Sequence, residues 1–340
     1  MGSEVTLKLP VIDFTSIELK GNNPNWEEVK SQVHKALVEY GCFEANFGKV
    51  PLDLRKDIFG ALHDLFDLPL QTKILNVSKK PYHGYVGQYP MVPLFESMGI
   101  DDAAIYDKVE SMTNILWPNG NPSFRHLSEL DQIVRKMVLE SLGVEKYLEE
   151  HMNSTNYLLR VMKYKGPQTS DTKLGLSAHT DKNIVTILCQ NQVEGLEVLT
   201  KDGKWTSYKP SPESFVVMIG DSLHCPSVLL KRELFQSREI SRSANVIYSN
   251  YYLHECLQAW SNGRLHSPFH RVMMRGNEAR YSAGLFSIPK GGVMIKAPEE
   301  LVDEEHPLLF KPFDHVEFLK YYYTEKGQKD PSAMRTYCGV

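Results

Sequence analysis

A histidine and an aspartate two positions apart could bind one metal ion from the same side. His179 and Asp181 lie in the stretch LSAHTDKNIVTILC, residues 176–189, where apolar and polar residues alternate as in a half-buried strand. Residues i and i+2 of a strand point to the same face, so this imidazole and this carboxylate could share an ion. Such a pair also arises by chance in a chain with 12 histidines and 42 acidic residues, as at His315 and Glu317. A third ligand therefore decides whether the pair forms a site.

The third ligand could come from the stretch NGRLHSPFHRV, residues 262–272, which contains His266 and His270. If both histidines belonged to one strand, they would face the same side. Strand geometry therefore does not decide which of them is the third ligand. Beyond them, Arg280 and Ser282 again share a face, and an arginine inside a barrel needs an anion. Two histidines, one carboxylate, open coordination positions and such an arginine match the iron sites that activate oxygen.

The first half of the chain, which must support this site, is mainly helical. Apolar spacing predicts helices over residues 25–40, 51–66 and 127–142, and Asn25 with Glu28 resembles a capping box at the first start. The other elements expected outside the β-rich half are the strands LPVIDF and GCFEANF, a Gly-, Pro- and Tyr-rich loop or lid over residues 80–102, and a helix over residues 314–324 that packs outside the barrel.

From residue 156 the hydrophobic period changes to two. Short runs separated by Gly, Pro, Asp or Asn predict a closed antiparallel sandwich or barrel. We therefore expect an α+β fold in which a helical region, residues 1–150, surrounds a barrel, residues 151–315, with a C-terminal helix and tail over residues 314–340. The predicted strands are NYLLRVMKY, NIVTILCQ, LEVLT, KWTSYKP, SFVVMIGD, HRVMM and RYSAGLFSI.

The chain resembles the plant family of iron(II)- and 2-oxoglutarate-dependent dioxygenases, which are similar to isopenicillin N synthase. The motifs that carry the resemblance are HTD, EGLEVL with DGKW, FVVMIGD, NGRLHSPFHRV and RYS, and LPVIDF and VEYGCFEANF look like the family's N-terminal region. The resemblance thus covers nearly the whole chain. It implies a double-stranded β-helix, or jelly-roll, barrel.

The resemblance also implies the site. It assigns His179, Asp181 and His270 as iron ligands. It also implies that Arg280 and Ser282 bind the distal carboxylate of 2-oxoglutarate. It further implies that Tyr164 helps to bind 2-oxoglutarate, and that Met162 stands where many relatives carry an asparagine that can donate a hydrogen bond.

The implied reaction needs Fe(II) as cofactor and 2-oxoglutarate and O2 as cosubstrates, with ascorbate in support. It oxidises a small plant specialised metabolite by hydroxylation, desaturation or a related reaction, and it releases succinate and CO2. Residues 80–102 resemble the subgroup that includes glucosinolate side-chain-modifying dioxygenases, and the candidate pocket residues in that segment are Tyr82, His83, Tyr85 and Tyr89.

Residues 225–258 interrupt the family pattern between GDSLH and AWSNGRLH. Removing these 34 residues would shorten the separation between His179 and His270 from 91 to 57 positions. The abrupt junctions favour a retained intron or a gene-model error over a genuine lid or interaction segment. The segment falls in the turn between the stretch that ends near Asp221 and the NGRLH stretch. If this turn can hold the segment outside the barrel, we expect His270 to keep its place, while the exposed apolar residues of the segment lower the stability of the protein.

Composition and charge exclude several other classes. The net charge is −4, and the basic residues are interspersed with acidic ones, so we expect no nucleic-acid partner. We find neither a signal or transit peptide nor an apolar run long enough to span a membrane, and the five cysteines are scattered without metal-binding spacing. We expect a cytoplasmic monomer that acts on a small molecule.

Two other functions remain open. A zinc hydrolase could use the same three metal ligands, but it would have no need of Arg280 and Ser282. A noncatalytic protein could bind metabolites or partners through a barrel that residues 225–258 disrupt, and it would not bind iron.

Overall fold

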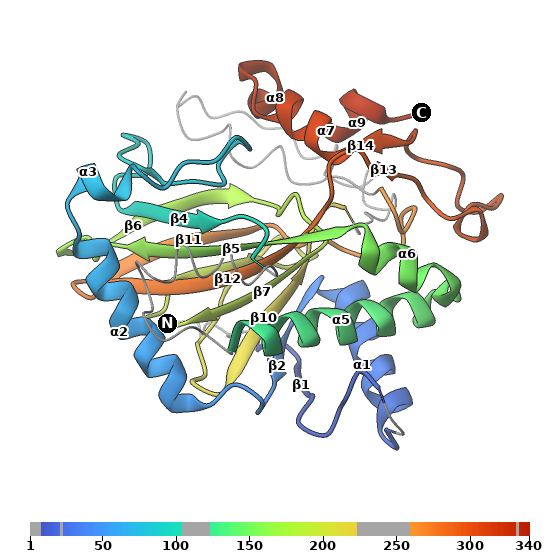
Figure 1. The fold of residues 1–340 in the computed structure, drawn as a ribbon, viewed down its shortest axis with the longest axis horizontal. Coiled ribbons are helices and arrows are strands. Elements are labelled where there is room, and N and C mark those ends of the chain that lie inside the picture. The colour runs from blue at the N-terminus through green and yellow to red at the C-terminus, as the bar shows by residue number, and fades with distance from the viewer. Residues whose placement is uncertain (1–7, 21–22, 104–122, 223–258, 331–332) are drawn as a thin grey trace, which may run out of the picture.

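Two β-sheets pack face to face, and helices cover the outer face of the larger one (Figure 1). The structure is a computed structural model that describes residues 8–20, 23–103, 123–222, 259–330 and 333–340. The prediction for residues 225–258 therefore lies outside the described residues.

The larger sheet has eight strands in the order β1-β2-β10-β7-β12-β5-β4-β3. All neighbours are antiparallel except β1 and β2, and β12 and β5 form a ladder ten residues long. The strands β1 to β4 come from the N-terminal region and lie at the two ends of the sheet order, so that region completes the barrel sheet. The strands are β1 Val11–Asp13, β2 Cys42–Asn46, β3 Val86–Gly87, β4 Phe95–Ile100, β5 Thr155–Tyr164, β7 Val185–Gln190, β10 Ser214–Ile219 and β12 Arg280–Pro289.

The smaller sheet has the order β6-β11-β8-β9 and closes the barrel. Its buried residues Val198 and Met274 belong to the same apolar cluster as Met162 and Val216 of the larger sheet. This packing confirms the predicted α+β jelly roll. The strands are β6 Thr169–His179, β8 Leu196–Leu199, β9 Trp205–Ser207 and β11 His270–Gly276.

Three long helices bury one face each against the outside of the larger sheet (Figure 1). In α5 the buried residues recur at helical spacing, which turns one apolar stripe toward the strands. The long helices are α1 Trp26–Glu39, α2 Leu52–Asp67 and α5 Ser123–Ser141, and the short ones are α3 Leu70–Lys73, η1 Glu145–Tyr147, α6 Leu148–Asn153 and η4 Glu299–Leu301.

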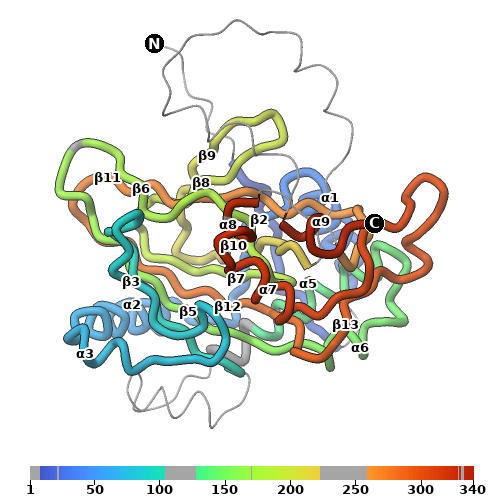
Figure 2. The backbone as a smooth tube through the Cα atoms, turned by 90° about the horizontal axis from the view of Figure 1, so that it is seen from above, coloured from blue at the N-terminus to red at the C-terminus, as the bar shows by residue number. Residues whose placement is uncertain are grey.

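The C-terminal helices lie over one end of the barrel, where α7 and α8 cover the strands in the view from above (Figure 2). The helix α7 packs outside the barrel, as predicted, and from there it also contributes to the wall of the cavity. Its residues His315, Leu319 and Tyr322 line the barrel cavity. The elements of this region are α7 His315–Tyr322, α8 Glu325–Lys329, α9 Ala333–Cys338 and the strand pair β13 Met294–Ile295 and β14 Phe313–Asp314.

Two other sequence predictions need correction. Asn25 does precede α1, but its side chain makes no capping hydrogen bond, and Glu28 instead accepts from Gln32 on the exposed face. The segment 80–102 is not all loop, because β3 and β4 lie within it and β4 is buried beside β5. Pairing with β5, which the local sequence does not show, makes this segment a strand.

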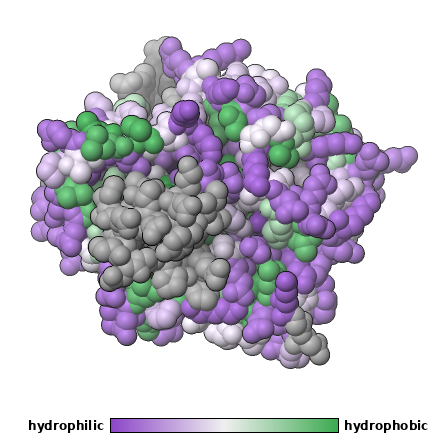
Figure 3. All heavy atoms as spheres, viewed as in Figure 1, coloured by the Kyte–Doolittle hydropathy of each residue, from purple (hydrophilic) through white to green (hydrophobic). Residues whose placement is uncertain are grey.

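Hydrophilic side chains cover most of the face shown in Figure 3, and the hydrophobic ones form small separate patches among the described residues. No helix of the described residues is both long and apolar enough to cross a membrane.

Candidate metal centre and substrate cavity

Two neighbouring strands bring His179 and His270 together. His179 ends β6, His270 begins β11, and the two residues are direct partners in the antiparallel ladder. Their ring centroids are 4.3 Å apart. His266 lies on the loop before β11, where its backbone N–H donates to the carbonyl of Leu37, and it does not join the cluster. The structure thus selects His270 over His266 as the candidate third ligand, a choice that sequence spacing alone could not make.

Asp181 completes the cluster from outside the strand. The run 176–189 is not one strand, because β6 ends at His179 and β7 begins at Val185. The turn after β6 places Asp181 Oδ1 3.7 Å from Nε2 of both histidines. One potential ligand atom from each of His179, Asp181 and His270 lies within 4.8 Å of the others. A turn, and not the alternation of a strand, therefore aims the carboxylate.

Backbone carbonyls orient both imidazoles. His179 Nδ1 lies 2.8 Å from the carbonyl oxygen of Ser177, and His270 Nδ1 lies 3.2 Å from that of Pro268. A carbonyl can only accept, so each Nδ1 carries the proton and each Nε2 presents a lone pair toward Asp181. Burial, followed by the neighbouring His270, lowers the pKa of His179 to about 4. The imidazole is therefore neutral at neutral pH, which is the form that binds a metal ion.

A hydrogen-bond network holds the turn that carries Asp181. Thr186 Oγ1 donates to Asp181 Oδ2 at 2.5 Å, which leaves Oδ1 facing the histidines. The backbone N–H of Asp221 donates to the carbonyl of Asp181 at 2.7 Å, and the Asp221 carboxylate pairs with Lys182 at 2.5 Å. Such partners of metal-binding residues fix their orientation. Sequence reasoning missed these three residues, because only the folded turn brings them to Asp181.

Arg280 lies deeper in the barrel with the other residues expected to bind 2-oxoglutarate. Its side chain is 1% exposed, donates to Gln190 Oε1 at 2.6 Å and to Ser282 Oγ at 3.3 Å, and lies 5.1 Å from the ring of Tyr164. Its Nε has no partner, and among the described residues its side chain donates to a hydroxyl and an amide oxygen and not to a carboxylate. A buried guanidinium with an orphan donor suits a bound carboxylate, so these residues fit one end of 2-oxoglutarate.

The metal cluster opens into a cavity of about 740 Å³. Its wall includes Met162 of β5, whose sulfur lies 3.6 Å from the hydroxyl of Tyr164, so the Arg280 group lies just behind this wall. Tyr82, His83 and Tyr89 line the cavity as candidates from the loop. Tyr85 does not, because its hydroxyl turns to Glu96.

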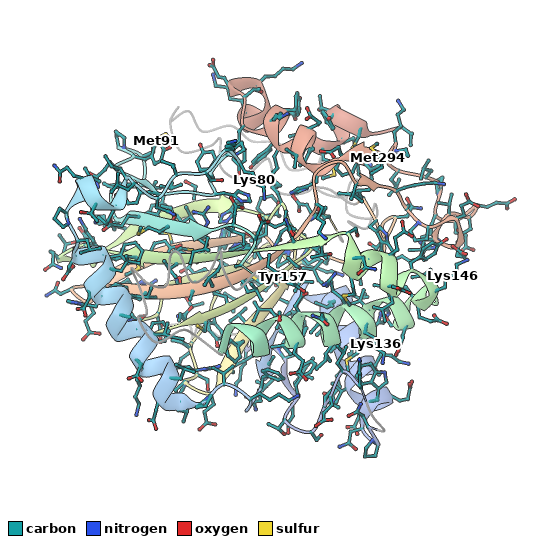
Figure 4. The ribbon with its side chains drawn as sticks, viewed as in Figure 1. Lys80, Met91, Lys136, Lys146, Tyr157 and Met294 are labelled. Atoms are coloured by element: carbon teal, nitrogen blue, oxygen red, sulfur yellow. The ribbon has the colours of Figure 1, made fainter. Side chains whose placement is uncertain are left out.

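Aromatic side chains of α7 also face this cavity. Tyr322 and Tyr323 line it, and the ring of Tyr323 packs 4.3 Å from that of Tyr82. Tyr322 and Tyr323 are therefore part of the cavity wall. Lys80 and Met91 mark the loop segment on the same side of the barrel as the C-terminal helices (Figure 4). His224 and His254 lie outside the described residues.

A jelly roll that holds two histidines and one carboxylate in its interior is the arrangement of non-haem iron oxygenases. Comparison with known families agrees with this class. The 2OG-Fe(II) oxygenase superfamily matches residues 149–289, and the family described as non-haem dioxygenase in morphine synthesis, N-terminal, matches residues 9–92.

Individual relatives narrow the class. The chain is 48% identical to AOP1.2 of Arabidopsis thaliana, a probable 2-oxoglutarate-dependent dioxygenase, over 98% of this chain and 96% of the relative. It is 32% identical to the 2-oxoglutarate-dependent dioxygenase AOP3 of the same plant, over 98% of each chain. The crystal structure of the rice dioxygenase for auxin oxidation aligns with a TM-score of 0.67 at 26% identity, over 98% of this chain and 100% of the other.

The chain belongs to the 2-oxoglutarate-dependent dioxygenases, a family of iron(II) enzymes. These relatives match the subgroup that residues 80–102 resemble, and they do not favour a zinc hydrolase or a noncatalytic protein.

Proposed function

We propose that the protein oxidises a small plant metabolite at an iron(II) centre held by His179, Asp181 and His270, with 2-oxoglutarate and O2 as cosubstrates. One observation carries this proposal: three potential ligand atoms lie within 4.8 Å of one another. The Nδ1 contacts support it further, because they leave both Nε2 atoms available to a metal ion.

Bound iron(II) would supply the oxygen-activating chemistry that couples conversion of 2-oxoglutarate to succinate and CO2 with oxidation of the substrate. The residues of the chain position the reactants. In the proposal Arg280 and Ser282 hold the distal carboxylate of 2-oxoglutarate, and Tyr164 packs beside it. Thr186 and the Asp221–Lys182 pair keep Asp181 aimed at the histidines. The apolar and aromatic wall of the cavity holds the substrate and excludes water.

The test is oxygen-dependent release of succinate by the full chain loaded with Fe(II), with a panel of small plant metabolites that includes auxin, the compound that the name of the rice relative gives. We expect at least one compound to raise succinate formation in step with its own oxidation. Arg280→Gln should raise the KM for 2-oxoglutarate about 30-fold or more, because a charge-assisted contact to a carboxylate is lost. Product formation without oxygen would favour hydrolysis and contradict the proposal.

We further propose that ascorbate supports turnover and that the protein acts as a cytoplasmic monomer without a nucleic-acid partner. The net charge of −4 supports the absence of a nucleic-acid partner, and the scattered cysteines support a reducing compartment. Light scattering of the purified chain and turnover with and without ascorbate test these points.

A further inference from the structure

In the described part of the chain, two permanent cations line the cavity, and only one of them has a carboxylate partner. Lys182 pairs with the buried Asp221 at 2.5 Å. Arg160 donates to the hydroxyl of Ser97 at 2.7 Å and forms no ion pair among the described residues. Among the described residues, Asp181 is the only carboxylate that lines the cavity, and its oxygens face Thr186 and the two histidines. The charge of Arg160 is therefore not balanced by a contact in the described part of the chain.

The strand holds this guanidinium at the cavity wall. Arg160 lies in the middle of β5, between β4 and β12 (Figure 1), where its direct partners are Gly99 and Gly284. Alternate residues of a strand share a face, and Leu158, Arg160 and Met162 all line the cavity. Ser97, which is fully buried, fixes one end of the guanidinium. A cation so placed has little freedom to turn away to solvent.

The rest of the wall is mostly apolar. Val86, Phe95, Leu176, Phe286 and Leu319 face the same space. Burial lowers the pKa of Arg160, which reflects the cost of keeping a positive charge there. An anion that enters the cavity would recover this cost through a charge-assisted hydrogen bond, and the planar fork of arginine suits a carboxylate or another oxyanion. A neutral ligand would leave the guanidinium desolvated and unpaired.

We propose that Arg160 binds the acid group of the substrate, and that the substrate is therefore a small organic anion with an apolar body. The inference rests on the proposed function, because it places this anion in the cavity that opens on the iron ligands. A cavity of about 740 Å³ has room for such a molecule. Arg160 thereby selects substrates by charge, while Arg280 serves the cosubstrate.

The experiment compares matched acids and neutral analogues by anaerobic calorimetry on the full chain with Fe(II) and saturating 2-oxoglutarate. The probes are phenylacetate, phenylmethanesulfonate and phenylacetamide, and the larger set indole-3-acetate and indole-3-acetamide. The two acids separate a preference for carboxylate from one for sulfonate. Saturating 2-oxoglutarate keeps the acids away from Arg280. We expect the acids to bind wild type at least about tenfold more tightly than the amides.

Arg160→Gln should weaken acid binding by about 30-fold and leave amide binding within about threefold. Arg160→Lys keeps the charge and should retain part of the preference for acids over amides. This variant provides a second test if Arg160→Gln folds poorly. The matched control is Lys163→Gln, because Lys163 lies on the same strand, pairs with Asp67 at 3.0 Å and does not line the cavity. It should keep the acid preference of wild type.

Equal binding of acid and amide, a preference that survives in Arg160→Gln, or no acid binding at all would overturn the inference. The iron and 2-oxoglutarate affinities are measured in the same samples. If they are normal and the acid preference is absent, the inference fails and the proposed function stands. If they are absent, the proposed function fails, and the same titrations of the metal-free chain still decide whether Arg160 selects acids.

Discussion

The backbone N–H of Trp260 donates to the carbonyl oxygen of Ser222 at 3.4 Å, although these residues are 38 positions apart in the chain. They flank the segment whose sequence, residues 225–258, interrupts the family pattern. Strand β11, which carries His270, begins ten residues after Trp260. The described residues on either side of the interruption are thus joined by one hydrogen bond, in a fold in which His270 reaches His179 and Asp181.

Deleting residues 225–258 should therefore leave the metal cluster intact. In the deletion variant Trp260 becomes the fourth residue after Ser222, so the same hydrogen bond would close one helical turn without moving either end. We expect iron affinity within about threefold of wild type and an equal or higher melting temperature, because a shorter loop costs less entropy to close. Loss of iron binding in the variant would show that the segment is required for the site.

A buried ion pair within α5 is joined to β5 by hydrogen bonds of its arginine. Arg135 is fully buried and pairs with Asp131 at 2.8 Å, and it also donates to Thr155 and to the hydroxyl of Tyr157. Tyr157 marks this contact near the centre of Figure 4. Arg135→Leu would leave Asp131 charged and unpaired in the core, so we expect the free energy of unfolding to fall by about 3–5 kcal/mol.

Urea denaturation measures this loss, and a second variant separates charge from packing. The double variant Asp131→Leu with Arg135→Leu removes the orphan charge and should be more stable than Arg135→Leu alone. If the double variant is the less stable of the two, the ion pair is not what makes Arg135 important.

Stability should fall in mild acid partly because of His315. The side chain is 1% exposed, and burial, followed by the nearby His83, lowers its pKa from 6.5 to about 3. Between these values the unfolded chain binds a proton that the folded chain does not. The contribution of His315 to the free energy of unfolding is therefore fully present above pH 6.5. Below that pH it falls by about 1.4 kcal/mol per pH unit.

His315→Leu removes this titration. Between pH 7 and pH 5, wild type should lose about 2 kcal/mol more unfolding free energy than the variant in chemical denaturation. Parallel pH profiles for the two proteins would mean that His315 is already protonated in the fold. His151, also buried and beside Arg135, has its pKa lowered as well and contributes in the same direction in both proteins.

Gly99 of β4 allows the cavity loop to approach the sheet. A Cβ at this position would lie 2.3 Å from the carbonyl oxygen of His83, which lines the cavity. Gly99→Ala should therefore displace the loop and lower the free energy of unfolding by about 1–3 kcal/mol. Gly60 of α2 has no atom within 4 Å of an added Cβ, so Gly60→Ala should be stabilising by about 0.4–1 kcal/mol. A Gly99→Ala protein as stable as wild type would show that the loop yields without cost.

Elements with a strong local pattern could be predicted from the sequence. Pro51 and the apolar spacing after it predicted the helix that the structure places at Leu52–Asp67. The alternating run before Tyr164 likewise predicted β5. In contrast, β6 is a mostly exposed polar strand whose pairing with β11 shifts register several times, and β4 lies within a Gly- and Pro-rich segment. Long-range pairing determines both, so local periodicity could not show them.

The site was predictable to the extent that its residues occur in motifs. HTD and the HRV stretch marked His179, Asp181 and His270, which the structure brings together, but spacing alone could not choose His270 over His266. Thr186 and Asp221 support Asp181 only through a turn, and α7 reaches the cavity only through its position over the barrel. These relations depend on the fold, and no sequence pattern contains them.

The central claim is that His179, Asp181 and His270 hold one iron(II) ion. Anaerobic calorimetric titration of iron(II) into wild type, His270→Ala and the matched control His266→Ala tests it most directly. We predict one iron per chain in wild type and in His266→Ala, and an affinity at least about 100-fold weaker in His270→Ala. Equal iron binding by all three proteins would contradict the claim.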